Sequence, residues 1–145
     1  MYETREVGLE NVFSRVVIKD TRNNVLVVQD RDCIWNFPGS KKEVNEAPVE
    51  CTIREIQEEI GILVHELIEI FQGDFQFGDK NWRGHFYLAS TVSGIPTIME
   101  PEKIKGIKFI RSHSEADFPN INKLIANSSL IQEKQTKWIT LPPLQ

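Results

Sequence analysis

The apolar residues of this chain fall into short runs typical of β-strands, with one longer amphipathic helix among them. The predicted strands are residues 12–19, 25–28, 63–77, 82–90 and 104–110. An asparagine-rich turn joins the first two, and we expect a bend at Gly73-Asp74 within the third. The second strand reads VLVV, which predicts a central strand covered on both faces. Residues 114–128 predict a final helix.

The amphipathic helix should begin at Pro48 and stop at Gly61, because proline suits a first helical turn and glycine a left-handed end. Apolar residues recur along it every three or four positions, which predicts one buried stripe of Val49, Ile53, Ile56 and Ile60. Three carboxylates share a neighbouring face: Glu55, Glu58 and Glu59. Like charges at this spacing repel by a few tenths of a kcal/mol per pair, so we expect a positive partner among them.

A hard divalent cation, Mg²⁺ or Mn²⁺, is one such partner, because it prefers carboxylate oxygens and completes its shell with waters and substrate phosphates. The proline and glycine of the preceding loop, FPGS, allow backbone groups to approach an ion and a phosphate chain. A solvated acidic helix face is the alternative interpretation of the same residues.

Residues 40–62 resemble the Nudix box, G-x(5)-E-x(7)-R-E-U-x-E-E-x-G-U, where U is an aliphatic residue. The matching residues are Glu46, Arg54, Glu55, Ile56, Glu58, Glu59, Gly61 and Ile62. The preceding WNFPG is also similar to the lead-in of many members. Ser40 replaces the leading glycine, although Gly39 stands beside it. If that position needs a positive φ, serine costs about 1 kcal/mol there.

The order of elements predicts a mixed β-sheet with a helix on each face, in agreement with the α/β/α sandwich that the resemblance implies. We expect one Nudix hydrolase domain over residues 1–145. The resemblance implies metal-dependent hydrolysis of a pyrophosphate bond in a nucleoside diphosphate linked to another moiety, and most specifically a (deoxy)nucleoside triphosphate pyrophosphatase. An RNA 5′-end pyrophosphohydrolase and a non-catalytic nucleotide-sensing domain are the alternatives.

By the same resemblance, the expected metal site combines the backbone of Gly39 with Glu55, Glu58 and Glu59. The residues expected to carry catalysis are Arg54, Glu55, Glu58 and Glu102. Glu58 is a further ligand or the base that takes the proton of water, and Arg54 would orient Glu46 or Glu58 by an ion pair. The segment E-P-E-K is similar to one that supplies a further glutamate in nucleotide-hydrolysing members. Glu102 is the first choice for that glutamate and Glu100 the alternate.

Candidate substrate contacts lie outside the box. Trp35 and Trp82 both adjoin loops and could stack on a nucleobase. Arg31, with Arg15, is a candidate phosphate contact. Ordinary core packing for the tryptophans, and a solvated surface for the arginines, are the alternatives.

Composition narrows the class of partner. The 145 residues carry a net charge of −4, which disfavours wholesale binding to nucleic acid or acidic membranes and favours a small nucleotide held through a cation. The sequence contains no run of 18 apolar residues, so we expect no membrane-spanning helix. Cys33 and Cys51 form no C-x-x-C pair, consistent with the reducing cytoplasm. The sequence leaves open whether the protein forms a homodimer.

Overall fold

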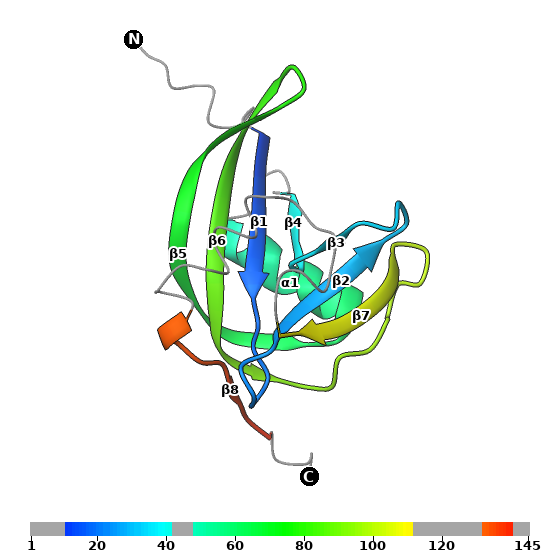
Figure 1. Ribbon diagram of the computed structural model, residues 1–145, viewed down its shortest axis with the longest axis vertical. Coiled ribbons are helices and arrows are strands. Elements are labelled where there is room, and N and C mark those ends of the chain that lie inside the picture. The colour runs from blue at the N-terminus through cyan, green and yellow to red at the C-terminus, as the bar shows by residue number, and fades with distance from the viewer. Residues whose placement is uncertain (1–10, 42–47, 112–131, 141–145) are drawn as a thin grey trace.

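The computed structural model describes residues 11–41, 48–111 and 132–140 (Figure 1). Their elements, in chain order, are β1 (Asn11–Val17), β2 (Val25–Asp30), β3 (Trp35–Asn36), β4 (Gly39–Lys41), α1 (Pro48–Ile60), β5 (Leu63–Phe77), β6 (Lys80–Ser93), β7 (Ile104–Ile110) and β8 (Lys137–Trp138). The predicted box helix and all the predicted strands are present. The helix expected over 114–128 lies outside the described residues.

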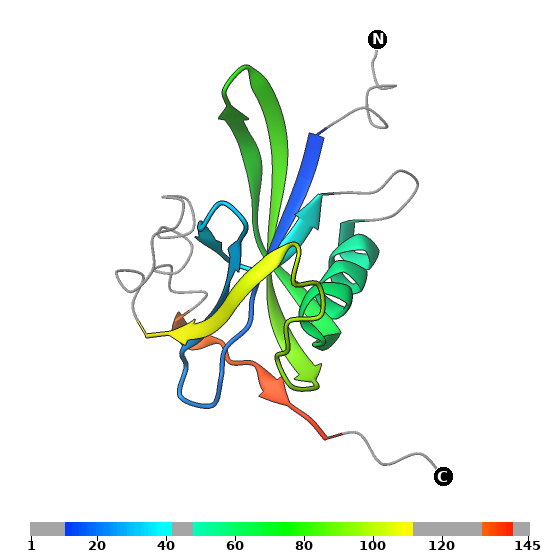
Figure 2. The ribbon, with the colours of Figure 1, turned by 90° about the vertical axis from the view of Figure 1, so that its right-hand side faces the viewer.

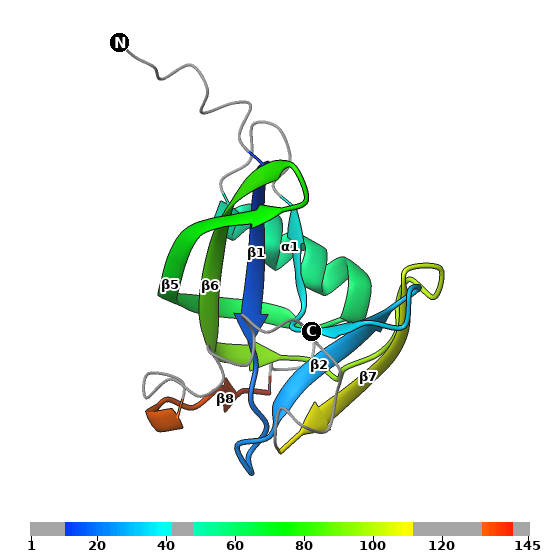
Figure 3. The ribbon, with the colours of Figure 1, turned by 45° about the horizontal axis from the view of Figure 1, so that its top comes forward.

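The strands form two sheets. The larger has the order β4-β1-β6-β5, with β8 paired to β6, and the smaller has the order β3-β2-β7. β1 runs parallel to β6 and antiparallel to β4, so the larger sheet is mixed, as predicted. Figure 3 shows the β2–β7 pair crossing the end of the layer that β1, β6 and β5 form.

Helix α1 lies against one face of the larger sheet (Figure 2). Ile56 and Ile60 are fully buried and Ile53 packs against the same cluster, but Val49 is 39% exposed. The predicted stripe is therefore wrong at its first position. Near the start of the helix β4 covers a different side, and Cys51 and Thr52 are the buried residues there. No helix in the described ranges is long and apolar enough to cross a membrane.

Strand β2 is central and covered on both faces, as the sequence predicted. It lies between β3 and β7. Leu26 and Val27 point to opposite faces and are both fully buried, each in a separate cluster of the core. The turn before β2 is built by Asp20, whose carboxylate accepts the backbone N–H groups of Arg22 and Asn24. This turn carries the chain from the larger sheet to the smaller one.

The long β5–β6 hairpin corrects one expectation. Strand β5 continues through residues 73–74, where Gly73 pairs with Gly84 and Asp74 with Arg83, so the predicted bend is wrong there. The irregularities of pairing fall earlier, between Val64 and residue 71. Extended pairing satisfies the backbone on both strands, and this outweighs the turn preference of a Gly-Asp dipeptide.

Candidate active site

A pocket of about 460 Å³ opens beside the box helix, and we call it the box pocket. It is lined by the cations Arg15, Arg31, Lys41 and Lys103, the carboxylates Asp30, Asp32, Glu55 and Glu59, the apolar residues Val28, Ile34, Phe37 and Ile104, and Asn36, Gly39 and Ser40. Glu55 and Glu59 both reach it because they lie one helical turn apart on α1. The box pocket thus offers charges of both signs beside apolar surface.

Burial raises the pKa of both glutamates in the box pocket. The pKa of Glu59 rises to about 7, first because burial desolvates its carboxylate and then because Glu55 and Glu100 are close. Lys103 and Arg15 partly oppose that rise. Burial likewise raises the pKa of Glu55. Because the charged forms are costly here, a bound cation would be strongly favoured.

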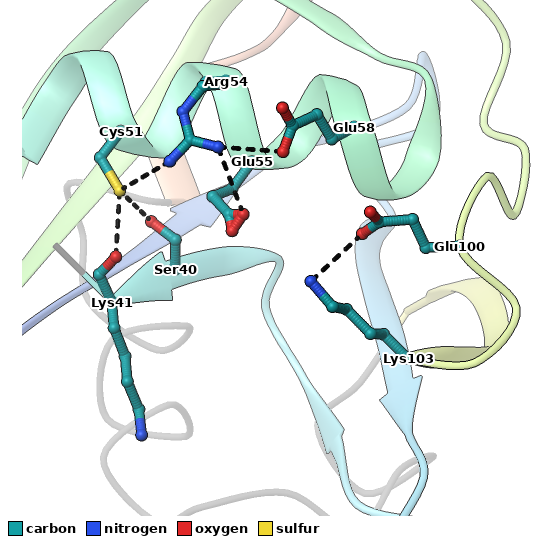
Figure 4. A network of polar contacts seen from close by, with 8 residues as sticks. All are labelled: Ser40, Lys41, Cys51, Arg54, Glu55, Glu58, Glu100 and Lys103. Atoms are coloured by element: carbon teal, nitrogen blue, oxygen red, sulfur yellow. Dashed lines mark hydrogen bonds and ion pairs between the residues drawn. The ribbon is translucent and has the colours of Figure 1, made fainter. Parts of the chain in front are cut away.

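Arg54 pairs with the third box glutamate, Glu58, beside the pocket. Its Nη1 lies 3.0 Å from Glu58 Oε1 and 3.8 Å from Glu55 Oε1 (Figure 4). The Glu58 side chain is 48% exposed and does not line the box pocket. The three carboxylates therefore divide, with two in the pocket and one on its flank. The ion pair expected for Arg54 forms with Glu58, whereas Glu46 lies outside the described residues.

The loop before β7 brings a further glutamate to this site. Lys103 Nζ lies 3.7 Å from Glu100 Oε1 (Figure 4), and that oxygen is buried without a hydrogen-bond partner among the described residues. Glu100 also raises the pKa of Glu59, whereas Glu102 is exposed. The alternate, Glu100, therefore lies with the pocket carboxylates and the first choice, Glu102, does not. Sequence reasoning missed Lys103, although it follows directly in E-P-E-K.

Gly39 is required by a close backbone approach rather than by its φ angle. In the pairing of β4 with β1, a Cβ atom on Gly39 would lie 1.8 Å from the carbonyl oxygen of Ser14. No side chain fits in that space. The glycine therefore holds the box loop tightly against β1 and brings its backbone into the wall of the box pocket.

Ser40, which replaces the first glycine of the box, is unstrained. Among described residues other than glycine, only Asn23 and Cys33 have a positive φ. Ser40 is buried, and its Oγ lies 3.3 Å from the Sγ atom of Cys51. The Cys51 thiol also donates to the carbonyl oxygen of Lys41 at 3.0 Å. Serine here links the loop to the helix. Because its φ is not positive, it does not carry the backbone cost of about 1 kcal/mol that a positive φ would impose.

The candidate substrate contacts separate into two groups. Arg15 and Arg31 line the box pocket, whereas Trp35 and Trp82 do not. The Trp35 ring packs beneath Lys108, with Nζ 4.4 Å from the ring centroid. Trp82 pairs across the hairpin with Phe75, which carries it to a different pocket near the β5–β6 turn.

The donors beside the box pocket suit a divalent cation. Within the described part of the chain, no three or more histidine, cysteine, aspartate or glutamate side chains are already grouped to hold a metal ion. Mg²⁺ usually binds through one or two carboxylates, with waters and phosphates as its other ligands. The raised pKa of Glu59 and the buried Glu100 oxygen, which lacks a hydrogen-bond partner among the described residues, both favour a cation nearby. Glu55, Glu59 and the backbone of Gly39 could hold it.

Comparison with known proteins identifies the family. A family model for the NUDIX domain matches residues 12–131. An 8-oxo-dGTP diphosphatase of Proteus vulgaris is 37% identical over 79 residues, which cover 51% of this chain and 70% of that protein. The mRNA-decapping enzyme subunit 2 of Saccharomyces cerevisiae is 27% identical over 123 residues, which cover 79% of this chain but 12% of that protein.

Solved structures share the fold. A MutT NUDIX hydrolase from Burkholderia pseudomallei superposes with a TM-score of 0.69 at 20% identity, covering 79% of this chain and 94% of that one. A MutT protein from Bacillus halodurans gives a TM-score of 0.64 at 21% identity, covering 88% and 86%. These likenesses confirm the predicted α/β/α sandwich. Together with the family match, they show that the chain belongs to the Nudix family, as a MutT-like pyrophosphohydrolase.

Proposed function

We propose that the protein hydrolyses (deoxy)nucleoside triphosphates, with Mg²⁺ or Mn²⁺ as its cofactor. The observation that carries this proposal is the gathering of Glu55, Glu59 and Glu100 beside cations that can hold a phosphate chain. Carboxylates alone would repel a triphosphate, and cations alone could not hold a metal. The box pocket supplies both.

The apolar part of the box pocket would bind the nucleoside. Val28, Ile34, Phe37 and Ile104 line it, and Ile34 is 46% exposed. A nucleobase that covers Ile34 gains about 25 cal/mol for each Å² of apolar surface removed from water. The relatives named 8-oxo-dGTP diphosphatase favour an oxidised purine deoxynucleotide as the first substrate to try.

In the proposed reaction, a water oxygen attacks one phosphorus of the pyrophosphate link and the bond to the bridging oxygen breaks. When bound, the cation supplies charge neutralisation on the phosphate oxygens and makes the water more acidic. Glu55 and Glu59 would hold that cation together with the Gly39 carbonyl. Glu100 would receive the proton of the water, since one of its oxygens is buried without a hydrogen-bond partner among the described residues. Glu58 would act through Arg54, whose ion pair fixes the flank of the site.

The second candidate is hydrolysis at the 5′ end of RNA, which the match to a decapping enzyme subunit favours. That match covers 12% of the relative, and a net charge of −4 disfavours a long polyanion. A small nucleotide remains our first choice.

The test is product release from a panel of substrates with Mg²⁺, with Mn²⁺ or with EDTA. The panel holds 8-oxo-dGTP, the four ordinary deoxynucleoside triphosphates, ADP-ribose, a dinucleoside tetraphosphate and an RNA bearing a 5′-triphosphate. We expect metal-dependent release of pyrophosphate, fastest from a nucleoside triphosphate. Release from the RNA alone would select the second candidate, and no release from any triphosphate would overturn the proposal.

We also propose that residues 1–145 act as one catalytic domain in the cytoplasm. Both cysteines, Cys33 and Cys51, are free thiols, which agrees with a reducing compartment. A homodimer formed through an edge strand stays a prediction, and light scattering on the purified protein tests it.

A further inference from the structure

Arg15 lies in the middle of β1 and lines the box pocket. It pairs in register with Gly39, so the close approach that requires a glycine at 39 also places Arg15 next to the box loop. Its guanidinium carbon lies 6.0 Å from the centroid of the Phe13 ring, two residues earlier on the same face of the strand. The fold thus directs this long side chain to the wall of the box pocket.

The guanidinium of the half-buried Arg15 has no hydrogen-bond or ion-pair partner among the described residues. Burial lowers the pKa of Arg15, and the attraction of Glu59 and Asp30 opposes this. Neither carboxylate comes within ion-pair distance, and no hydrogen bond joins the guanidinium to a described residue. A guanidinium presents five N–H donors in a rigid fork, and leaving them unpaired in a desolvated site is costly.

Lys19, two residues after the end of β1, shows what a structural cation looks like in this fold. It is 3% exposed, and its Nζ donates to the carbonyl oxygen of Lys134 at 2.7 Å. That contact holds a distant segment in place. Arg15 makes no comparable contact among the described residues, so its donors are available to a ligand.

We infer that Arg15 is a phosphate-binding residue of the box pocket, which engages the substrate independently of the metal. This inference rests on the nucleotide hydrolysis proposed above and names a residue that the box motif does not contain. The planar fork of arginine matches two oxygens of a phosphate, and such charge-assisted pairs are about twice as strong as neutral hydrogen bonds. Arg15 is a binding residue here and takes no part in proton transfer.

The test compares Arg15→Met and Arg15→Lys with Arg22→Met, which removes an exposed arginine from the turn before β2. Calorimetry in EDTA measures the binding of inorganic pyrophosphate and of a nucleoside monophosphate, so that the two sources of phosphate are distinguished. Wild type and Arg22→Met should bind at least one of them. Arg15→Met should weaken that binding by roughly 10- to 100-fold, the scale of a hydrogen bond to a charged group.

Two further measurements separate binding from structure. With metal and substrate, Arg15→Met should raise KM by a similar factor and change kcat by less than about threefold, since uniform binding is lost. Its melting temperature should stay the same or rise, because methionine fills the space without an unpaired charge. Arg15→Lys should keep part of the affinity, as a point charge without the fork.

A fall of several degrees in the melting temperature of Arg15→Met, with binding in EDTA unchanged, would assign Arg15 a structural role and overturn the inference. Failure of wild type to bind either ligand in EDTA would also overturn it. If wild type hydrolyses no triphosphate but binds pyrophosphate through Arg15, the proposed function fails while the phosphate site stands. If turnover is present and Arg15→Met has the KM of wild type, this inference alone fails.

Discussion

Two pockets of this protein have the same volume, about 460 Å³, but differ in how far their polar groups are paired. The second, which we call the hairpin pocket, is lined by Asn11, Asp74, Phe75, Gln76, Asn81, Trp82 and Arg83. Two pairs of its polar groups satisfy each other. Arg83 lies 3.3 Å from the Asp74 carboxylate, and the Asn11 amide donates to the carbonyl oxygen of Asn81.

Some polar groups in or beside the box pocket stay unsatisfied. Glu59 has a pKa of about 7, Arg15 has no hydrogen bond to a described residue, and a buried oxygen of Glu100 beside the pocket has none either. Unsatisfied polar groups destabilise the free protein, and a ligand that pairs with them offsets this destabilisation. Volume does not distinguish the two pockets, whereas their unsatisfied polar atoms do.

The largest expected effect comes from the same chemical change made in each pocket. Glu59→Gln should lower kcat by roughly 10²-fold or more, because a charged metal-binding group is lost from the site. Asp74→Asn should leave kcat within about twofold, since it breaks only an exposed ion pair. Steady-state kinetics with the best substrate of the panel measure both. Equal losses would show that the comparison between the pockets does not locate catalysis.

The next effect distinguishes two glutamates of one loop. Glu100→Gln should lower kcat by roughly 10-fold or more, on the scale of general base catalysis. Glu102→Gln, which changes an exposed carboxylate two residues away, should lower it less than about twofold. The same kinetic assay measures kcat of both variants, and circular dichroism checks that both are folded. If Glu102→Gln is the slower enzyme, the first choice from sequence was the better one.

The local part of this site could be predicted from sequence. Helical spacing alone places Glu55 and Glu59 one turn apart, and it also places Arg54 one turn before Glu58, with which it pairs at 3.0 Å. Strand positions followed from apolar runs, because each run fills one side of a sheet. Such features depend on residues close in the chain, where backbone geometry fixes the outcome.

The remaining part depends on contacts between distant segments. Arg15 lies at the box pocket because β1 pairs with β4. Trp82 lies outside that pocket because the register of the β5–β6 hairpin places it opposite Phe75 and its ring beside Phe13. Val49 is exposed because β4 covers the other side of the first helical turn. No periodicity in a single sequence encodes these registers.

The pH dependence of stability offers a smaller effect. The pKa of Glu59 is raised from 4.5 to about 7, so its contribution to the stability of the metal-free fold is full below pH 4.5 and is lost as pH rises through 7. The melting temperature of Glu59→Gln minus that of wild type should therefore grow by a few degrees between pH 4.5 and pH 8 in EDTA. Thermal denaturation at several pH values measures this difference.

Two controls accompany that measurement. Asp74→Asn, in the hairpin pocket, should show a far smaller trend over the same pH range. Mg²⁺ should raise the melting temperature of wild type more at pH 8 than at pH 5, because the cation competes with the proton for the carboxylate. A difference between Glu59→Gln and wild type that does not change with pH would mean that Glu59 is ionised normally in the free protein.

The smallest effect is expected at Ser40, the residue of the box pocket that departs from the Nudix pattern. Its φ is not positive, so glycine would relieve no strain there, and Ser40→Gly should keep kcat/KM within about twofold. It should also lose up to about 1 kcal/mol of stability, because glycine gains backbone freedom in the unfolded chain and the contact with Cys51 is removed. Chemical denaturation and the kinetic assay check these two outcomes, with Cys51→Ala as the matched variant that removes the same contact from the helix side. A tenfold gain in kcat for Ser40→Gly alone would show that the serine restrains the loop during turnover, since Cys51→Ala leaves the backbone at position 40 unchanged.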